Sequence, residues 1–349
     1  MKCLVLSLLL FIDVSLASPL PHHDGILEEI KQNIVIEDPK HRWSMVPDAE
    51  GRMHLIDLNP YEMPVEPLFN AAADIRFILH TRSNPTAGQV IQLENLASLQ
   101  NSNFNPAHET RITIHGWLGT AGSTVHVNTR PQYLEVDNFN LVTVDWSVGA
   151  SSINYITARN RVDDAAAVVA RFIDFCHLHG FIQFPRVHII GHSLGGQMAG
   201  VAGKRVSRGR VQVITALDPA GPLFSLNDPD RRVAPTDGVY VEVIVTNGGV
   251  LGFMDPIGQA NFYPNFGVAQ PGCGSDASGQ CAHERVNAFF AESIRTVFTG
   301  RQCASFAEIG NNQCTPTGVT SRMGGAFGSV GASGIFHLTT NANAPFSMG

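Results

Sequence analysis

Short apolar and β-branched runs recur along the chain and alternate with longer stretches of helical spacing. The runs predict buried strands at 111–114, 141–144, 187–190, 213–217 and 239–245. Near-continuous apolar strands are typically buried on both faces, and alternation of strands with helices implies parallel pairing. The pattern therefore predicts an α/β fold with a mostly parallel central sheet flanked by helices.

Helical periodicity is clearest between the second and third runs. Apolar residues recur at helical spacing from Val162 to Cys176, and Gly180 follows as a C-terminal cap. No internal repeat or low-complexity tract interrupts the pattern, so residues 62–349 are predicted to form a single domain. Residues 18–61 are rich in Pro, His and charge without a sustained period, which favours an N-terminal arm or a propeptide.

Residues 1–17 have the composition of a secretory signal peptide. A basic start is followed by an apolar run at 4–12 and by small residues at 15–17. The apolar run is too short to span a bilayer. The sequence therefore predicts a secreted, extracellular protein.

Charge and cysteine content narrow the possible partners and the compartment. Lys and Arg total 23 against 30 Asp and Glu, a formal net charge of −7, which argues against nucleic acid as a partner. Loss of the signal peptide removes Cys3 and leaves five cysteines. The pairs Cys273–Cys281 and Cys303–Cys314 each enclose a short polar loop and are the economical disulfides, whereas Cys176 lies in an apolar helical stripe as a buried thiol.

A G-x-S-x-G pentapeptide spans Gly191 to Gly195, directly after the apolar run 187–190. Small residues compatible with a helix follow it. Strand, tight turn and helix in that order form a nucleophile elbow, in which glycines permit the strained turn and the helix N-terminus supplies N–H groups. Ser193 is therefore the predicted nucleophile.

A serine nucleophile needs a base and a carboxylate, which follow it in the order Ser, acid, His in α/β-hydrolases. Asp218 comes directly after the strand 213–217, and strand ends are where such sheets carry their chemistry. His283, the first histidine downstream, is expected in a loop just past the Cys273–Cys281 bridge, whereas His337 lies in a strand-like run and is interpreted as structural. The competing carboxylates all fall in loop stretches: Asp228, Asp230, Asp237 and Asp255.

A further Gly-flanked turn, His115-Gly116-Trp117, caps the strand 111–114. The backbone N–H of Trp117 and that of Leu194, the residue after the nucleophile, are the two predicted oxyanion donors.

Five ordered motifs resemble the pancreatic-lipase family of secreted lipases and A1-type phospholipases, with a layout closest to insect digestive members. They are His115-Gly116-Trp117, Val144-Asp145-Trp146-Ser147, Gly191-His192-Ser193-Leu194-Gly195-Gly196, Leu217-Asp218-Pro219-Ala220 and Cys281-Ala282-His283-Glu284-Arg285. The resemblance implies an α/β-hydrolase fold with Ser193 as nucleophile, Asp218 as acid and His283 as base. It also implies the backbone N–H groups of Trp117 and Leu194 as the oxyanion donors.

The chain also departs from that family. It stops before a C-terminal β-sandwich domain, so no colipase is expected. The loop between Cys273 and Cys281 is short and polar and cannot form an amphipathic lid helix, which predicts an open site. The family's calcium loop aligns with 232–237, but Ala234 stands where a carboxylate is expected, so neither a metal nor another cofactor is predicted.

Two functions follow from these observations. The first is a secreted serine esterase that cleaves lipid esters through an acyl-enzyme, as a triacylglycerol lipase, a phospholipase A1, or both. The second is a non-catalytic lipid-binding or yolk-type storage protein with the same fold. Intact Ser193, Asp218 and His283 favour the enzyme. The sequence leaves open whether the lipid is an acylglycerol, a phospholipid or a galactolipid.

Overall fold

The computed structural model describes residues 43–48, 52–57 and 68–349. The predicted signal peptide, residues 1–17, lies outside the described residues, as does most of the predicted arm 18–61. Within the described ranges no helix is long and apolar enough to cross a membrane.

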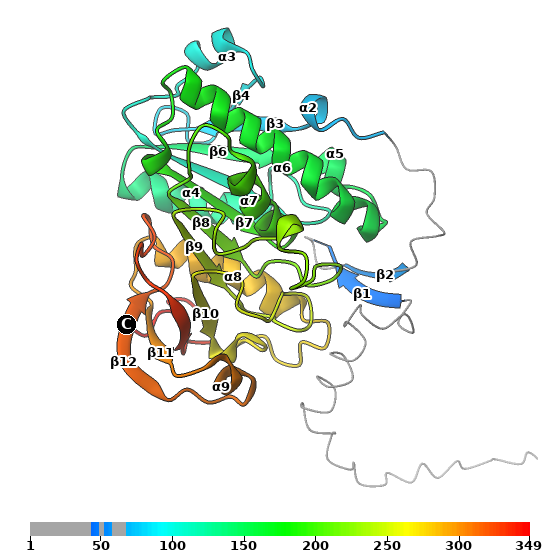
Figure 1. The fold of residues 1–349 in the computed structure, drawn as a ribbon, viewed down its shortest axis with the longest axis vertical. Helices are drawn as coiled ribbons and strands as arrows, with labels where there is room; N and C mark the ends of the chain where they lie inside the picture. The colour runs from blue at the N-terminus through cyan, green and yellow to red at the C-terminus, as the bar shows by residue number, and fades with distance from the viewer. Residues whose placement is uncertain (1–42, 49–51, 58–67) are drawn as a thin grey trace, which may run out of the picture.

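One sheet of eleven strands organises this part of the chain, in the order β12-β11-β13-β10-β9-β8-β7-β5-β6-β3-β4 (Figure 1). The strands are β3 (Arg76–His80), β4 (Gln89–Ile91), β5 (Glu109–Ile114), β6 (Phe139–Asp145), β7 (Val187–His192), β8 (Val213–Leu217), β9 (Tyr240–Ile244), β10 (Ala260–Pro264), β11 (Thr299–Cys303), β12 (Pro316–Arg322) and β13 (Gly334–Leu338).

The middle of the sheet is parallel. The five predicted strands are β5 to β9, and each pairs with its sheet neighbour among them in parallel register. Strands β10 and β13 extend the parallel region. Antiparallel pairing is confined to the two margins, where β3 joins β6 and β4, and β11 joins β13 and β12. The prediction of a mostly parallel sheet is confirmed.

Helices cover both faces of the sheet (Figure 1). Two of them, α6 (Tyr155–Leu178) and α7 (Leu194–Arg205), pack on each other and on one face, whereas α4 (Thr124–Val136) and α8 (Gln280–Ser293) pack together on the other. Successive residues of β7, such as Ile189 and Ile190, point into separate core clusters because side chains alternate along a strand.

The predicted helix 162–176 is the C-terminal part of α6. That helix begins after Asn154, whose side chain accepts a hydrogen bond from the N–H of Ile156, and Gly180 follows its end with φ of 77°. The remaining helices are short: α2 (Ala71–Asp74), α3 (Leu96–Gln100), α5 (Ser147–Ala150), α9 (Phe306–Gly310), and the 3-10 turns η1 (Phe184–Arg186), η2 (Pro229–Arg231) and η3 (Asn265–Gly267).

Two strands lie apart from the main sheet. Strands β1 (Trp43–Pro47) and β2 (Met53–Asp57) form an antiparallel pair in which Val46 lies opposite His54. They lie within residues 18–61, for which the sequence favours an N-terminal arm or a propeptide.

The structure contains both predicted disulfides. Cys273 and Cys281 have Cα atoms 5.6 Å apart, and those of Cys303 and Cys314 are 4.9 Å apart. Cys176 is a buried free thiol on α6.

Candidate active site

Ser193 occupies the turn between β7 and α7, with a positive φ of 57° and ψ of −123°. This strained conformation depends on glycine neighbours. A Cβ on Gly191 would lie 1.9 Å from the carbonyl oxygen of Gly195, and a Cβ on Gly195 would lie 2.4 Å from that of Ile114. Only glycine fits such close backbone approaches, so the pentapeptide forms the predicted tight turn.

The two segments that carry the predicted oxyanion donors adjoin Ser193. Leu194 is the first residue of α7, where N–H groups have no partner within the helix. Trp117 follows Gly116, whose added Cβ would lie 2.8 Å from the Cβ of Ser193, so this turn packs directly against the serine. The indole Nε1 of Trp117 donates to the carbonyl of Ser152 at 2.8 Å and anchors the turn.

Asp218 and His283 are 65 residues apart in the sequence but in direct contact in the structure. Asp218 follows β8 with φ of 39°, and its side chain is inaccessible to solvent. Its Oδ1 accepts the N–H groups of Thr246 and Asn247 at 2.8 and 3.0 Å, and its Oδ2 lies 2.5 Å from Nδ1 of His283. The carboxylate therefore holds the proton of His283 on Nδ1 and leaves Nε2 to accept another.

The structure differs from the sequence prediction in where His283 sits. It lies in the first turn of α8 and not in a loop. The carboxylate of Asp276 accepts the N–H groups of Cys281 and Ala282 at 3.2 and 2.8 Å, which satisfies the start of this helix. The disulfide from Cys273 joins the same turn.

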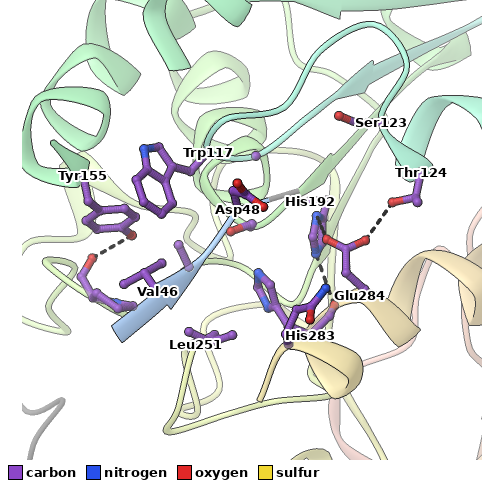
Figure 2. A pocket seen from close by; sticks show the side chains of 15 residues that line it. Val46, Asp48, Trp117, Ser123, Thr124, Tyr155, His192, Leu251, His283 and Glu284 are labelled. Atoms are coloured by element: carbon purple, nitrogen blue, oxygen red, sulfur yellow. Dashed lines mark hydrogen bonds and ion pairs between the residues drawn. The ribbon is translucent and has the colours of Figure 1, made fainter. Parts of the chain in front are cut away.

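One pocket brings these residues together. Gly116, Trp117, Ser193 and His283 all line it (Figure 2). The carboxylate of Asp218 lies behind His283 and contacts its Nδ1. The competing groups lie elsewhere: His337 stacks on Phe266 with ring centroids 4.0 Å apart, and Asp237 pairs with Lys204.

A second histidine and a glutamate support His283, and sequence reasoning assigned them no role. The Nε2 of His192 donates to the carbonyl oxygen of His283 at 3.2 Å, and burial lowers the pKa of His192. Glu284 accepts from Thr124 at 2.8 Å and from Asn287 at 3.0 Å (Figure 2). Both residues stood inside the quoted motifs, but their contacts depend on α4 and α8 packing together.

The pocket is not open, contrary to the expectation from the short loop between Cys273 and Cys281. Val46 and Asp48 of the β1 end line it beside Ser193 and His283, and the remaining cavity is about 30 Å³ (Figure 2). The loop between Cys273 and Cys281 is short, as its sequence indicates, and it forms no lid helix. The covering residues come from the N-terminal arm, whose position in space no local pattern reveals.

The loop that aligns with the family's calcium site holds a cation of the chain itself. The ammonium of Lys204 lies 3.0 Å from Oδ1 of Asp237 and donates to the carbonyl oxygens of Pro229 and Arg232 at 2.6 and 3.3 Å. Among the described residues, the groups with enough potential metal ligands are each built on a disulfide-bonded cysteine pair, whose sulfurs are not free thiolates.

A mixed, mostly parallel sheet with helices on both faces and a serine elbow after a central strand defines the α/β-hydrolase fold. The sequence matches the model of the family described as "Lipase" over residues 57–346. The chain therefore belongs to the lipase family that includes pancreatic triacylglycerol lipase.

Individual relatives show how far the likeness extends. Lipase member H of Oryctolagus cuniculus is 34% identical over 255 residues, covering 70% of this chain and 55% of that protein. Pancreatic triacylglycerol lipase of Ictidomys tridecemlineatus is 31% identical, covering 82% and 68%. A Mus musculus protein named inactive pancreatic lipase-related protein 1 is 34% identical, covering 69% and 55%. The chain thus spans little more than half the length of several relatives.

Proposed function

We propose that this chain is a secreted serine esterase that hydrolyses the carboxylic ester bonds of lipids through an acyl-enzyme on Ser193. The observation that carries the proposal is the 2.5 Å contact between His283 Nδ1 and the buried carboxylate of Asp218, in the pocket that Ser193 lines. A relative named inactive belongs to the same family, so activity has to be argued from the site.

In the first half of the proposed reaction, Ser193 Oγ attacks the ester carbonyl while Nε2 of His283 takes the hydroxyl proton. Asp218 stabilises the resulting imidazolium and holds its orientation. The backbone N–H groups of Trp117 and Leu194 donate to the oxyanion of the tetrahedral intermediate. Collapse breaks the bond to the alcohol, which leaves with the proton from His283.

In the second half, water attacks the acyl group on Ser193, and His283 accepts a proton from that water. The second tetrahedral intermediate releases the fatty acid and returns the proton to Ser193. The reaction consumes one ester and one water and needs no cofactor. Two disulfides and the family membership support an extracellular setting, because disulfides persist in oxidising compartments.

The test is Ser193→Ala, assayed on trioleoylglycerol and on labelled phosphatidylcholine side by side. We expect a loss of about 10³-fold or more on whichever lipid the protein cleaves. Ser305→Ala is the matched control, since Ser305 is exposed and its side chain makes no capping bond. Near-normal turnover by Ser193→Ala would overturn the proposal, and an inactive wild type that binds lipid would favour the storage protein.

A further inference from the structure

Strands β1 and β2 form a small hairpin whose backbone pairing is reinforced by side-chain contacts of Asp48. The carboxylate of Asp48 accepts the backbone N–H and the Nε–H of Arg52 at 2.8 and 2.7 Å and contacts Nε2 of His54 at 2.9 Å. Burial alone would raise the pKa of Asp48, but these hydrogen bonds lower it to about 2. The hairpin therefore carries a permanently charged carboxylate at the end that enters the pocket.

The inner face of this hairpin fills the candidate active site. Val46 is 6% exposed and lines the pocket with Asp48, Ser193 and His283 (Figure 2). The ring of His54 packs edge-on against Trp117, with ring centroids 5.2 Å apart. The cavity of about 30 Å³ that remains accommodates water. Pockets for lipid-sized ligands are about ten times larger or more, so an ester cannot enter while the hairpin stays in place.

The outer face of the hairpin carries three exposed apolar side chains, and Asp57 lies opposite Trp43 on the same face. Trp43, Met45 and Leu55 are 51%, 48% and 61% exposed, because alternate residues of a strand point to opposite sides. Ile153, 70% exposed, is a further exposed apolar residue, two positions before Tyr155, which lines the pocket. A large apolar surface of this kind marks an interaction site.

We propose that the hairpin of β1 and β2 is a cover whose outer face docks on a lipid–water surface, and that docking draws Val46 and Asp48 out of the pocket. This inference rests on the proposed function, because the pocket it uncovers is the candidate active site. A lipid aggregate is the partner that fits, since the hairpin exposes Trp43, Met45 and Leu55 while its inner residues line a pocket whose proposed substrates are themselves aggregated lipids.

The architecture permits such a movement. The hairpin forms its own two-stranded sheet and makes no strand pairing with the eleven-stranded sheet, so its departure leaves the central strands intact. An isolated two-stranded hairpin is marginally stable in water. Side chains of Val46, His54 and Ile56 are among those that hold it on the core, and transfer of the outer side chains into lipid offsets the loss of such contacts.

The experiment measures the rate at which a fluorophosphonate labels Ser193 in the protein without residues 1–17, with and without vesicles of diether phosphatidylcholine, which contain no ester. In the wild type, vesicles should raise the rate about tenfold. Val46→Ser should raise the rate without vesicles by a similar factor, because it weakens the inner contact. His54→Ala is a second variant of that face, and equal thermal midpoints establish that each variant folds.

Leu55→Ser tests the outer face, and it should raise the vesicle concentration for half-maximal labelling about tenfold. Val319→Ser is the matched control, an exposed valine on β12 at the far edge of the sheet, and it should change neither measurement. If labelling is equally fast with and without vesicles, and is unaltered in the inner-face variants, the proposal that the hairpin covers the pocket is overturned.

A labelling rate that depends on protein concentration and not on vesicles would identify a second copy as the partner and overturn the lipid assignment. If Ser193 is never labelled and no ester is cleaved under any condition, the proposed function itself fails. Ester hydrolysis without any vesicle effect, in contrast, removes the cover and leaves the proposed function standing.

Discussion

Replacement of Asp218 by asparagine tests the proposed acid through the direction of one hydrogen bond. The side chain is fully buried, and two backbone N–H groups, from Thr246 and Asn247, point at Oδ1. An asparagine has one acceptor oxygen, which must face these two donors. Its amide NH₂ then faces Nδ1 of His283, so the histidine keeps its proton on Nε2 and cannot accept one from Ser193.

The size of the effect follows from the cost of the opposite orientation. Turning the amide round would leave two buried N–H donors unsatisfied, at about 1–3 kcal/mol each. The productive arrangement is therefore disfavoured by about 2–6 kcal/mol, which corresponds to a loss of roughly 30-fold to 10⁴-fold in kcat. The upper end agrees with the roughly 10⁴-fold loss known for the same change in another serine hydrolase.

The assay is kcat on a short-chain ester in the presence of diether phosphatidylcholine vesicles, compared at equal amounts of folded protein. Asp237→Asn is the control for a buried carboxylate outside the pocket, since Asp237 pairs with Lys204, and it should leave turnover within a few-fold of the wild type. If Asp218→Asn keeps more than about a tenth of the activity, or if the two variants lose activity equally, Asp218 is not the acid.

Two further predictions concern stability. Lys204→Met leaves the carboxylate of Asp237 buried without its ammonium, so the free energy of unfolding should fall by about 3 kcal/mol, whereas an excess of chelator should not move the thermal midpoint of the wild type; unchanged stability of the variant would contradict this account. Burial raises the pKa of Glu242 from 4.5 to about 7 despite donors from Gly324 and Tyr240. The native state therefore holds a proton that the unfolded chain has released between pH 4.5 and 7, and stability falls across that window by about 3 kcal/mol. Denaturant unfolding at pH 5 and pH 8 should show a smaller fall in Glu242→Gln, and an identical fall in both proteins would refute the assignment.

The central strands were predictable because a strand buried on both faces has an almost continuously apolar sequence. Strands β5 to β9 are almost continuously apolar, and their parallel pairing follows from the helices between them. The strands at the margin of the sheet that β12 forms lack such an apolar run. Strand β12, with the sequence PTGVTSR, is largely exposed and reads as a loop.

The serine turn was predictable for a similar reason, since strand, tight turn and helix are contiguous in sequence. The pairing of Asp218 with His283 required the order of the motifs along the chain. The helical position of His283 was missed because the residue that caps α8, Asp276, stands five residues before Cys281 and not next to the helix.

The hairpin over the pocket illustrates what local patterns omit. The sequence predicts only an arm or a propeptide over 18–61, where it has no sustained period, and assigns no strand there. The position of the hairpin leaves no local pattern either, because Val46 lines a pocket with residues far along the chain and His54 packs against Trp117. The expectation of an open site failed at this step.

The outermost strands of the large sheet decide whether it can recruit strands from another molecule. At one edge β4 has three residues, too few to template a long pairing. At the other, β12 begins with Pro316, which has no N–H to donate, carries Gly318 at φ of 91°, and pairs with β11 through an irregular register. Proline, short length and bulges are the devices by which natural sheets resist edge-to-edge aggregation. The fold is therefore protected against β-type polymerisation at high concentration, even though its sheet is not closed.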